Sequence, residues 1–387
     1  MYREKVEDLL LFKNKHFIKI ITGVRRCGKS TLLNIFENEL KKDKNNNIIH
    51  INFEEYKYQY LTDKELYQLL KSQIRSNTYL LLDEIQRVQK WELVINSLFA
   101  EYSDLDIYIT GSNAYLLSSE LSTYLAGRYI EIKLLPFSFK EFIKFNNFEA
   151  NKSSFNLYVK YGGMPSLSGS LNDKESGIIL DGISSSIIMK DIIEQVQIKD
   201  VKTLQKIILF LSDNIGNITS INNVKNVLFT EKSKHITTIE NYIKALENAF
   251  LFYEVDKYDI KGKEFLKPQN KYYIVDLGLR NFLLNKINDT GRIIENIVYL
   301  ELLRRDYKVY VGKINNTEVD FIAEKNNDKI YFQVSETIIS HETLERELKP
   351  LQSIKDNYEK ILLTMDETFV KDYDGIKVIN IIEWLAN

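Results

Sequence analysis

Cysteine is nearly absent from this sequence, and long apolar runs are missing. The single cysteine, Cys27, excludes a disulfide within the chain, which fits a reducing compartment. No apolar stretch approaches the ~20 residues that a membrane-spanning helix needs. Residues 1–15 mix acids and bases and lack the apolar centre of a signal peptide. We therefore expect a cytoplasmic protein without a membrane segment.

A large net charge is also missing. The 52 Lys and Arg residues nearly balance the 54 Asp and Glu residues, and the formal net charge is −2. This balance argues against a globally basic coat for nucleic acid but leaves a local basic patch open. Apolar residues make up 44% of the chain, enough to bury hydrophobic cores. At about 150 residues per domain, the length predicts two or three domains.

The first part of the chain alternates between strand and helix patterns. Helical spacing of apolar residues appears at 29–41, 63–74 and 91–102. Short apolar segments predict strands at 17–21, 48–53, 79–82, 106–110 and 129–134. Such alternation is typical of a parallel α/β sheet, and we expect a domain of this class at residues 1–150.

The pattern changes after residue 145. Residues 146–154 are polar and predict a loop or linker. The spacing then predicts three helices and two strands joined by a lysine-rich loop, at 201–214, 221–228, 237–250, 252–256 and 271–275. This order is typical of a winged helix, which we expect in a helical domain at 151–280. A further α/β domain is expected at 281–387.

A phosphate-binding loop is the clearest motif. Residues 23–30 read GVRRCGKS, which fits G-x-x-x-x-G-K-[ST] between a predicted strand and a predicted helix. Glycines allow the tight turn that points backbone N–H groups at phosphates, and the helix adds its positive end. Lys29 is expected to reach the β- and γ-phosphates of ATP, and Ser30 to bind Mg²⁺. The predicted ATP-binding residues are Gly23, Val24, Arg25, Arg26, Cys27, Gly28, Lys29, Ser30, Thr31 and, from another strand, Ser112.

Two carboxylates follow the apolar strand at 79–82. Asp83 is expected to hold Mg²⁺, and Glu84 to polarise an attacking water as general base. An acidic turn in solvent is the alternative, but the phosphate loop upstream favours catalysis. Cys27 lies near a helix N-terminus, which lowers the pKa of thiols, so a redox switch is open. We favour a passive role in the loop.

Two further groups complete the predicted catalytic set. Ser112 and Asn113 follow the strand at 106–110, where small polar side chains can sense the γ-phosphate and orient water. Arg128 is expected to stabilise charge in the transition state, in its own site or in that of a neighbouring subunit. A solvated surface arginine is the alternative. The predicted catalytic residues are Lys29, Glu84, Asn113 and Arg128.

At these residues the chain resembles a family, the bacterial and archaeal AAA+-like ATPases with a C-terminal domain of unknown function. The resemblance covers nearly the whole chain and includes segments 23–31, 82–86, 110–113, 125–128, 161–165, 291–296 and 318–321. The first two are specific for nucleotide hydrolysis, while the others mark the family without a chemistry. The resemblance implies a P-loop fold and leaves the cellular role open.

The last domain resembles the PD-(D/E)xK, restriction-endonuclease-like fold. A hairpin around residues 325–328 sets Asp320 across from Gln333, and Glu295 on the preceding helix can converge on both. A working nuclease site would carry a lysine two residues after Gln333, where this chain has Ser335. Because metal-assisted cleavage needs a metal cage and an activated nucleophile, we predict an inactive nuclease-like domain.

Several functions remain open. The main hypothesis is a MgATP-driven switch or motor, and oligomers are possible. The second hypothesis is a DNA-associated regulator or defence protein, because double-stranded DNA could contact the lysines of the predicted wing. The third predicted helix of the winged helix argues against DNA binding because it carries Glu240 and Glu247. A protein partner is equally open. A small-molecule kinase is the third, although the Asp83–Glu84 pair favours hydrolysis. The wing lysines are Lys257, Lys261, Lys263, Lys267 and Lys271.

Overall fold

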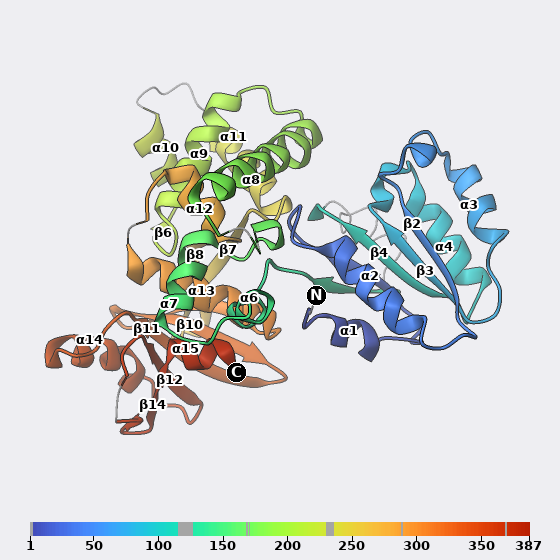
Figure 1. Ribbon diagram of the computed structural model, residues 1–387. Helices are drawn as coiled ribbons and strands as arrows, with labels where there is room; N and C mark the ends of the chain where they lie inside the picture. Colours follow the sequence, from blue (N-terminus) through green and yellow to red (C-terminus); the bar gives the residue numbers. More distant parts are fainter. Residues whose placement is uncertain are drawn as a thin grey trace. The chain divides into compact units, whose positions relative to one another are not determined.

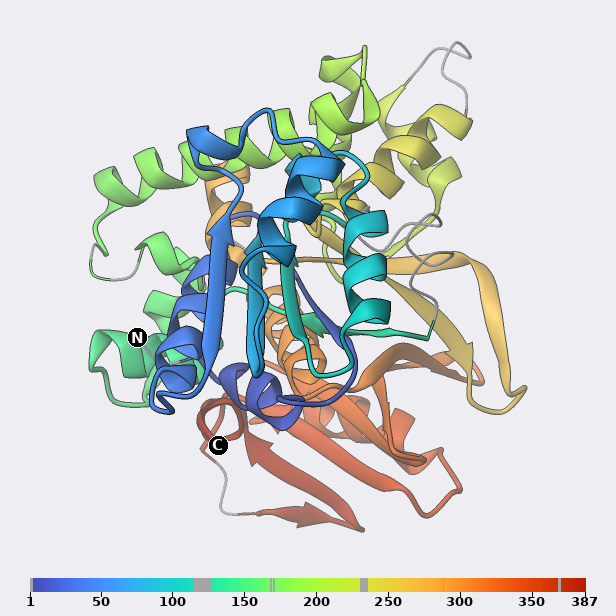
Figure 2. The ribbon, with the colours of Figure 1, turned by 90° about the vertical axis from the view of Figure 1, so that its right-hand side faces the viewer.

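The computed structural model describes residues 3–114, 127–167, 169, 171–229, 236–287, 289–367 and 370–387 (Figures 1 and 2). The chain forms two compact units. The first contains residues 1–136 with 248–250, and the second contains 137–247 with 251–387. The first unit therefore ends before the boundary that we expected at residue 150. Among the described residues, no helix has the length and apolar character to cross a membrane.

The first unit is built on a five-stranded sheet in which all neighbours are parallel. The strand order is β2-β3-β4-β1-β5. The strands are β1 (Ile18–Thr22), β2 (Asn47–Asn52), β3 (Thr78–Asp83), β4 (Asp106–Gly111) and β5 (Tyr129–Lys133). The predicted parallel sheet is thus confirmed, with strand boundaries within a residue or two of those expected. The strand that precedes the phosphate loop and the strand that ends in Asp83 are separated by β4.

Helices cover this sheet because each carries an apolar face. In α2 (Lys29–Leu40) the buried residues include Leu32, Leu33, Phe36 and Leu40, the face that helical spacing predicts. A capping box at Thr62 and Glu65 starts α3 (Asp63–Lys71). With α4 (Trp91–Glu101), α3 packs over the hydrophobic core on the sheet. The remaining elements are α1 (Val6–Leu11) and the 3₁₀ turns η1 (Tyr56–Tyr58) and η2 (Ile85–Arg87).

The second unit begins with helices. They are α6 (Phe139–Asn146), α7 (Lys152–Tyr161), η4 (Pro165–Leu167), α8 (Asp173–Ser186), the π-helix η5 (Ile187–Glu194), α9 (Val201–Asp213), α10 (Ile221–Leu228), α11 (Ile236–Asn248), α12 (Leu277–Leu284) and α13 (Thr290–Arg304). The linker expected at 146–154 is only a short turn, because Asn151 caps α7 through its side chain. The helices predicted at 201–214, 221–228 and 237–250 correspond to α9, α10 and α11.

A nine-stranded sheet forms the rest of the second unit, in the order β13-β14-β12-β11-β10-β9-β7-β8-β6. Its hairpin β7–β8 joins the C-terminal strands because β7 pairs in parallel with β9. The expected boundary at residue 280 therefore does not divide this sheet. The strands are β6 (Ile218–Thr219), β7 (Phe252–Asp259), β8 (Glu264–Ile274), β9 (Lys308–Ile314), β10 (Thr317–Lys325), β11 (Asp328–Ser335), β12 (Glu359–Thr364), β13 (Asp372–Tyr373) and β14 (Ile376–Asn380).

The hairpin β10–β11 has the predicted register. Phe321 pairs with Phe332, so Asp320 lies across from Gln333, and the backbone N–H of Asp320 donates to Gln333 Oε1 at 3.4 Å. Asn326 and Asn327 turn the chain with φ of 52° and 66°, a left-handed conformation that asparagine tolerates. Helix α14 (His341–Gln352) then leads to β12, which is parallel to β11, and α15 (Ile381–Ala386) ends the chain.

Candidate functional site

The carboxyl ends of β1, β3 and β4 meet at one edge of the parallel sheet, where open α/β folds bind ligands. The phosphate loop leaves β1 and enters α2 at Lys29. Asp83 ends β3, and Ser112 follows β4. Parallel pairing thus brings together three segments that lie far apart in the sequence.

The phosphate loop has a backbone conformation that requires glycine at positions 23 and 28. Gly28 has φ of 102°, and a Cβ atom on Gly23 would lie 2.1 Å from the carbonyl oxygen of Leu134. Lys29 is buried, and its Nζ donates to the carbonyl oxygens of Gly23 at 3.0 Å and Val24 at 3.3 Å. Ser30 is exposed in the first turn of α2. The ammonium group of Lys29 therefore lies under the loop that is expected to hold phosphates.

A hydrogen-bonded chain fixes the two carboxylates. The Thr110 hydroxyl donates to Asp83 Oδ1 and accepts from the backbone N–H of Glu84, at 3.0 Å for the latter contact. Glu84 has φ of 56°, a conformation that residues other than glycine rarely adopt and that concentrates at functional sites. Gln86 Nε2 donates to Glu84 Oε2 at 2.6 Å. Local strain and these bonds hold the Glu84 side chain toward the loop.

Glu84 is buried and lies beside a lysine. Its Oε1 is 3.9 Å from Lys29 Nζ. Burial raises the pKa of Glu84 above its ordinary value, and the nearby Asp83 adds to this rise, while Lys29 and Arg25 oppose it. A carboxylate with a raised pKa is a stronger base, which suits proton abstraction from water near neutral pH.

Two further predicted residues reach the same edge. Ser112 and Asn113 are buried, with 2% and 8% of their surface exposed. Arg25 Nη2 donates to Ser112 Oγ at 3.5 Å, which joins the phosphate loop to the end of β4. Cys27 is fully buried, and burial raises the pKa of its thiol, which disfavours the reactive thiolate. Burial thus favours the passive role over the redox switch in this conformation.

Arg128 does not reach this edge. It precedes β5, and its carbonyl oxygen accepts from the N–H of Ile18, the first residue of β1. Its guanidinium donates to Asn96 Oδ1 on α4. At about 3.3 Å per residue, the length of β1 separates Arg128 from the phosphate loop by roughly 16 Å. This position favours the alternative in which Arg128 acts in the site of a neighbouring subunit, and the role itself stays a prediction. Leu125 and Ala126 of the same segment lie outside the described residues.

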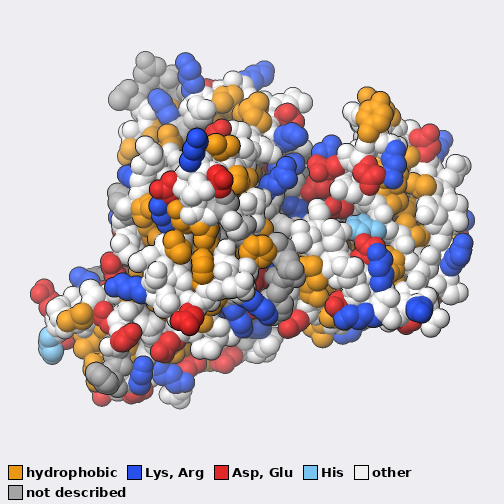
Figure 3. All heavy atoms as spheres, in the orientation of Figure 1, with side chains coloured by type: hydrophobic (Ala, Val, Ile, Leu, Met, Phe, Trp, Pro, Cys, Tyr) orange, Lys and Arg blue, Asp and Glu red, His pale blue; other side chains and the backbone are white. Residues whose placement is uncertain are grey.

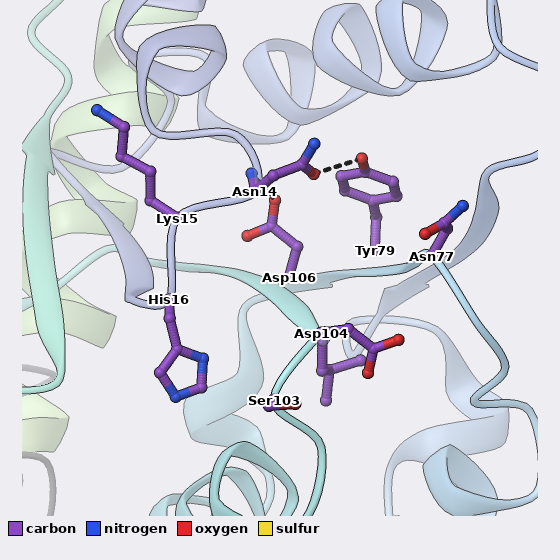
Figure 4. Close-up of a pocket in the computed structure, with 9 residues that line it drawn as sticks. Asn14, Lys15, His16, Asn77, Tyr79, Ser103, Asp104 and Asp106 are labelled. Carbon is purple, nitrogen blue, oxygen red and sulfur yellow. Dashed lines mark hydrogen bonds between the residues drawn. The ribbon is translucent and has the colours of Figure 1, made fainter.

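A cavity of about 280 Å³ opens at the other, amino-terminal edge of the sheet (Figure 4). The Tyr79 hydroxyl donates to Asn14 Oδ1 at 2.6 Å, and the Asn14 N–H donates to Asp106 Oδ2 at 2.8 Å. Asp106 also accepts from Lys19, which is fully buried in β1. These polar groups satisfy one another on the edge opposite to the phosphate loop, so this cavity is distinct from the predicted ATP site.

The predicted nuclease-like residues meet in the second unit, together with residues that sequence reasoning missed. Lys271 on β8 is buried, and its Nζ lies 2.8 Å from Glu295 Oε1 and 2.7 Å from Glu318 Oε1. The Tyr273 hydroxyl donates to Glu295 Oε1 at 2.6 Å. We call Lys271, Tyr273, Glu295, Glu318 and Asp320 the carboxylate–lysine cluster. The sequence does carry one signal for the buried Lys271, because this lysine lies inside the apolar strand pattern at 271–275.

The remaining predicted residues of this region are engaged in the fold. Burial and the charge of Glu295 raise the pKa of Asp320 well above its ordinary value, and Asp320 Oδ2 accepts from the Val334 N–H at 2.8 Å. Gln333 Nε2 donates to Glu347 at 2.9 Å, and Ser335 Oγ donates to the carbonyl oxygen of Thr337 at 2.9 Å. Across the described residues, no group of three or more His, Cys, Asp or Glu side chains is placed to hold a metal.

The lysine-rich hairpin differs from a free wing. Lys257 and Lys271 are buried, and Lys257 Nζ lies 3.1 Å from Glu318 Oε2. These two lysines are therefore unavailable to DNA phosphates, contrary to expectation. Lys261 and Lys263 are exposed at the turn, while the side chain of Lys267 lies outside the described residues. On the face that Figure 3 shows, positive and negative side chains are interspersed.

The fold and the loop define a class, the AAA-type P-loop ATPases. A family model described as an AAA domain matches residues 15–143. A Walker-type ATPase of Pyrococcus abyssi superposes with a TM-score of 0.51 at 15% identity, over 73% of this chain and 95% of that chain. This likeness is one of fold. A second model, a domain of unknown function (DUF8612), matches residues 152–290.

Two relatives match along nearly the whole chain. An uncharacterized protein of Haemophilus influenzae is 43% identical over 98% of this chain and 97% of its own length. An uncharacterized protein of Methanocaldococcus jannaschii is 33% identical over 94% of this chain and 85% of its own length. The chain belongs to the family that these two relatives represent.

Proposed function

We propose that the first unit binds MgATP at residues 23–31 and hydrolyses it to ADP and phosphate. The observation that carries this proposal is the approach of Glu84 to the phosphate loop, with its Oε1 3.9 Å from Lys29 Nζ. A buried carboxylate with a raised pKa beside the loop lysine is the pairing that hydrolysis requires.

The residues present suit a bound Mg²⁺. The Ser30 hydroxyl and the Asp83 carboxylate supply the oxygen ligands that this ion prefers, directly or through water. Mg²⁺ would offset negative charge on the phosphate oxygens during the reaction. Lys29 would bind the β- and γ-phosphates, Glu84 would take a proton from the attacking water, and Asn113 and Ser112 would orient that water and the γ-phosphate.

The cycle of ATP binding and hydrolysis would drive a conformational switch or motor, with the second unit carrying its output. Arg128 lies on the amino-terminal edge of its own sheet, so any contact with a γ-phosphate would be with ATP bound by another copy of the chain. We therefore propose that Arg128 acts in trans in an oligomer. We expect the protein to work in the cytoplasm.

In the second unit we propose a winged-helix-like segment fused to an inactive nuclease-like core. The order α9, β6, α10, α11, β7, β8 supports the first, and α13, β9, β10, β11, α14, β12 supports the second. Lys271 occupies the space between the carboxylates, and Gln333 and Ser335 lack the chemistry of a metal-dependent nuclease. Cleavage of DNA with Mg²⁺ or Mn²⁺, abolished in Asp320→Ala, would overturn the second proposal.

The alternative is a DNA-associated regulator or defence protein. The exposed lysines of the β7–β8 turn, Lys261 and Lys263, favour it because they can contact phosphates. A protein partner on the same surface is equally compatible, since exposed charges are commonly only solvated.

Turnover of MgATP by the wild type and by Lys29→Ala tests the central proposal. We expect Mg²⁺-dependent turnover by the wild type and its loss in Lys29→Ala. Lys41→Ala is the matched control, because Lys41 is exposed at the end of the same helix and pairs with Glu37 on the surface. Equal turnover in all three proteins would place the activity outside this site.

A further inference from the structure

Arg25 lies within the phosphate loop, and its side chain spans two other segments. Its Nη2 is 3.5 Å from Ser112 Oγ, at the carboxyl end of β4. Its Nη1 is 3.9 Å from Glu54 Oε1, in the segment after β2. Only 15% of the side chain is exposed. The guanidinium therefore lies over the edge of the sheet where β1, β3 and β4 end.

Arg25 and Lys29 reach the ends of neighbouring strands. Ser112, which Arg25 contacts, follows β4, and Glu84 follows β3, the strand that pairs with β4. Lys29 is 3.9 Å from Glu84. Two cations of the loop thus lie at the carboxyl edge of the sheet. This is the side of the loop where a γ-phosphate and its attacking water would meet.

The chemistry of hydrolysis calls for such a cation. When water attacks the γ-phosphorus and the bond to the β-phosphate oxygen breaks, negative charge spreads over oxygens that a guanidinium can bind. Arginine offers a planar fork of donors that matches phosphate, which lysine lacks. Arg128 of the same chain lies at the opposite edge, so it cannot supply this group to its own site.

The ion pair between Arg25 and Glu54 is easily exchanged. Glu54 is 46% exposed, and its Oε1 lies closer to Arg87 Nη2, at 2.7 Å, than to Arg25. Ion pairs at such exposure contribute little to stability. Arg87 can keep Glu54 while the Arg25 guanidinium turns to a more strongly charged phosphate.

We propose that the Arg25 side chain is a catalytic residue supplied in cis, which exchanges Glu54 for the γ-phosphate of ATP and stabilises its charge during hydrolysis. This inference rests on the proposed ATP site and adds to it a specific role for one side chain. It distinguishes Arg25 from the other loop positions between the two glycines, whose expected contribution is through backbone N–H groups.

The test compares Arg25→Ala, Arg25→Gln and Arg25→Lys with the wild type in kcat, KM, ATP and ADP affinity, and Tm. We expect Arg25→Ala and Arg25→Gln to lower kcat by about 10²- to 10³-fold. KM should change much less, and affinity should fall for ATP but hardly for ADP. Arg25→Lys should recover part of kcat because it restores the charge without the fork.

Two variants separate catalysis from a structural link. Glu54→Gln removes the exchanged partner and should keep kcat within about three-fold, because a neutral amide competes poorly with phosphate. Lys41→Gln, at the exposed end of α2, serves as a surface control and should also leave kcat unchanged. Equal losses of kcat and Tm in Arg25→Ala and Glu54→Gln would mean that Arg25 only ties the loop to Glu54, and would overturn the inference.

The affinities for ATP and ADP distinguish failure of the proposed hydrolysis from failure of the proposed role of Arg25. If Arg25→Ala and Arg25→Gln turn over ATP as fast as the wild type, the proposed hydrolysis is supported and the proposed role of Arg25 is contradicted. If the wild type binds ATP without turnover, the proposed hydrolysis is wrong. The preference for ATP over ADP then still tests whether Arg25 contacts the γ-phosphate. Loss of that preference in Arg25→Gln supports the contact with the γ-phosphate, and its retention contradicts it.

Discussion

Each unit of this protein buries a lysine beside carboxylates, but the surroundings differ. In the first unit Lys29 lies 3.9 Å from Glu84, under a glycine-containing loop at the carboxyl edge of a parallel sheet. In the second, Lys271 holds Glu295 and Glu318 at 2.8 and 2.7 Å, and Tyr273 donates to Glu295 as well.

The difference lies in which groups satisfy the charges. In the carboxylate–lysine cluster, side chains of β8, β10 and α13 are one another's partners within the fold. In the first unit, Lys29 donates to loop carbonyl oxygens that a phosphate ligand could replace, and Glu84 keeps a raised pKa. The same residue types thus make an internal ion pair in one place and the proposed reactive site in the other.

Removal of Lys271 should have the largest effect on stability. Lys271→Met leaves the mostly buried carboxylate of Glu295 without its lysine, whereas Glu318 keeps Lys257 at 3.1 Å. Breaking a buried pair such as Lys271–Glu295 costs about 3–5 kcal/mol. Unfolding in urea, followed by circular dichroism, measures the loss. Lys261→Met, on the exposed turn of the same hairpin, is the control and should change stability by less than about 0.5 kcal/mol.

The pH dependence of turnover should follow Glu84. Its ionised form is the base, and burial raises its pKa, so kcat should fall on acidification at a pH above the ordinary value of 4.5. Arg25 lowers this pKa, so Arg25→Gln should move the acid limb to higher pH. Profiles of kcat against pH for both proteins test the shift. If the acid limb of the kcat profile does not move in Arg25→Gln, the charge of Arg25 does not act on Glu84.

Asp320→Asn should be mild by comparison with Lys271→Met. Burial raises the pKa of Asp320, so the folded state disfavours its charged form. An uncharged amide of the same shape should therefore change stability by no more than about 1 kcal/mol. As pH rises from the unfolded pKa through the folded pKa, the wild type should lose stability relative to Asp320→Asn. Urea unfolding across pH measures this difference, and a constant difference would contradict the raised pKa.

The smallest effect concerns the exposed lysines. If duplex DNA binds the β7–β8 turn, Lys261→Gln with Lys263→Gln should weaken binding modestly and lower the slope of log affinity against log salt by about 2. Fluorescence anisotropy with labelled duplex DNA at several salt concentrations measures both. An unchanged slope would remove the turn from any DNA interface.

Local patterns predicted the first unit well. The phosphate loop, the carboxylates after β3 and the polar end of β4 are short motifs, and a parallel sheet brings such strand ends together. The same rule could have placed Arg128, because a residue that precedes a parallel strand lies at the amino edge. The β10–β11 register was also predictable, since a two-residue turn fixes Asp320 across from Gln333.

The carboxylate–lysine cluster could not be predicted in the same way. Lys271 meets Glu318 because β7 pairs with β9 and extends the sheet, a pairing between segments that no local pattern encodes. A lysine-rich hairpin in sequence is equally compatible with a solvated wing. Only the strand order shows that Lys257 and Lys271 face the interior while Lys261 and Lys263 are exposed.

Glu84→Gln tests the central claim most directly, because it preserves the size of the side chain and the fold while removing the base. The measurement is Mg²⁺-dependent ATP turnover and ATP affinity of wild type and variant, each with and without duplex DNA. We predict that the variant binds ATP as tightly as the wild type and loses turnover by about 10²- to 10⁴-fold. Equal turnover by both proteins, or none by the wild type under any of these conditions, would contradict hydrolysis at this site.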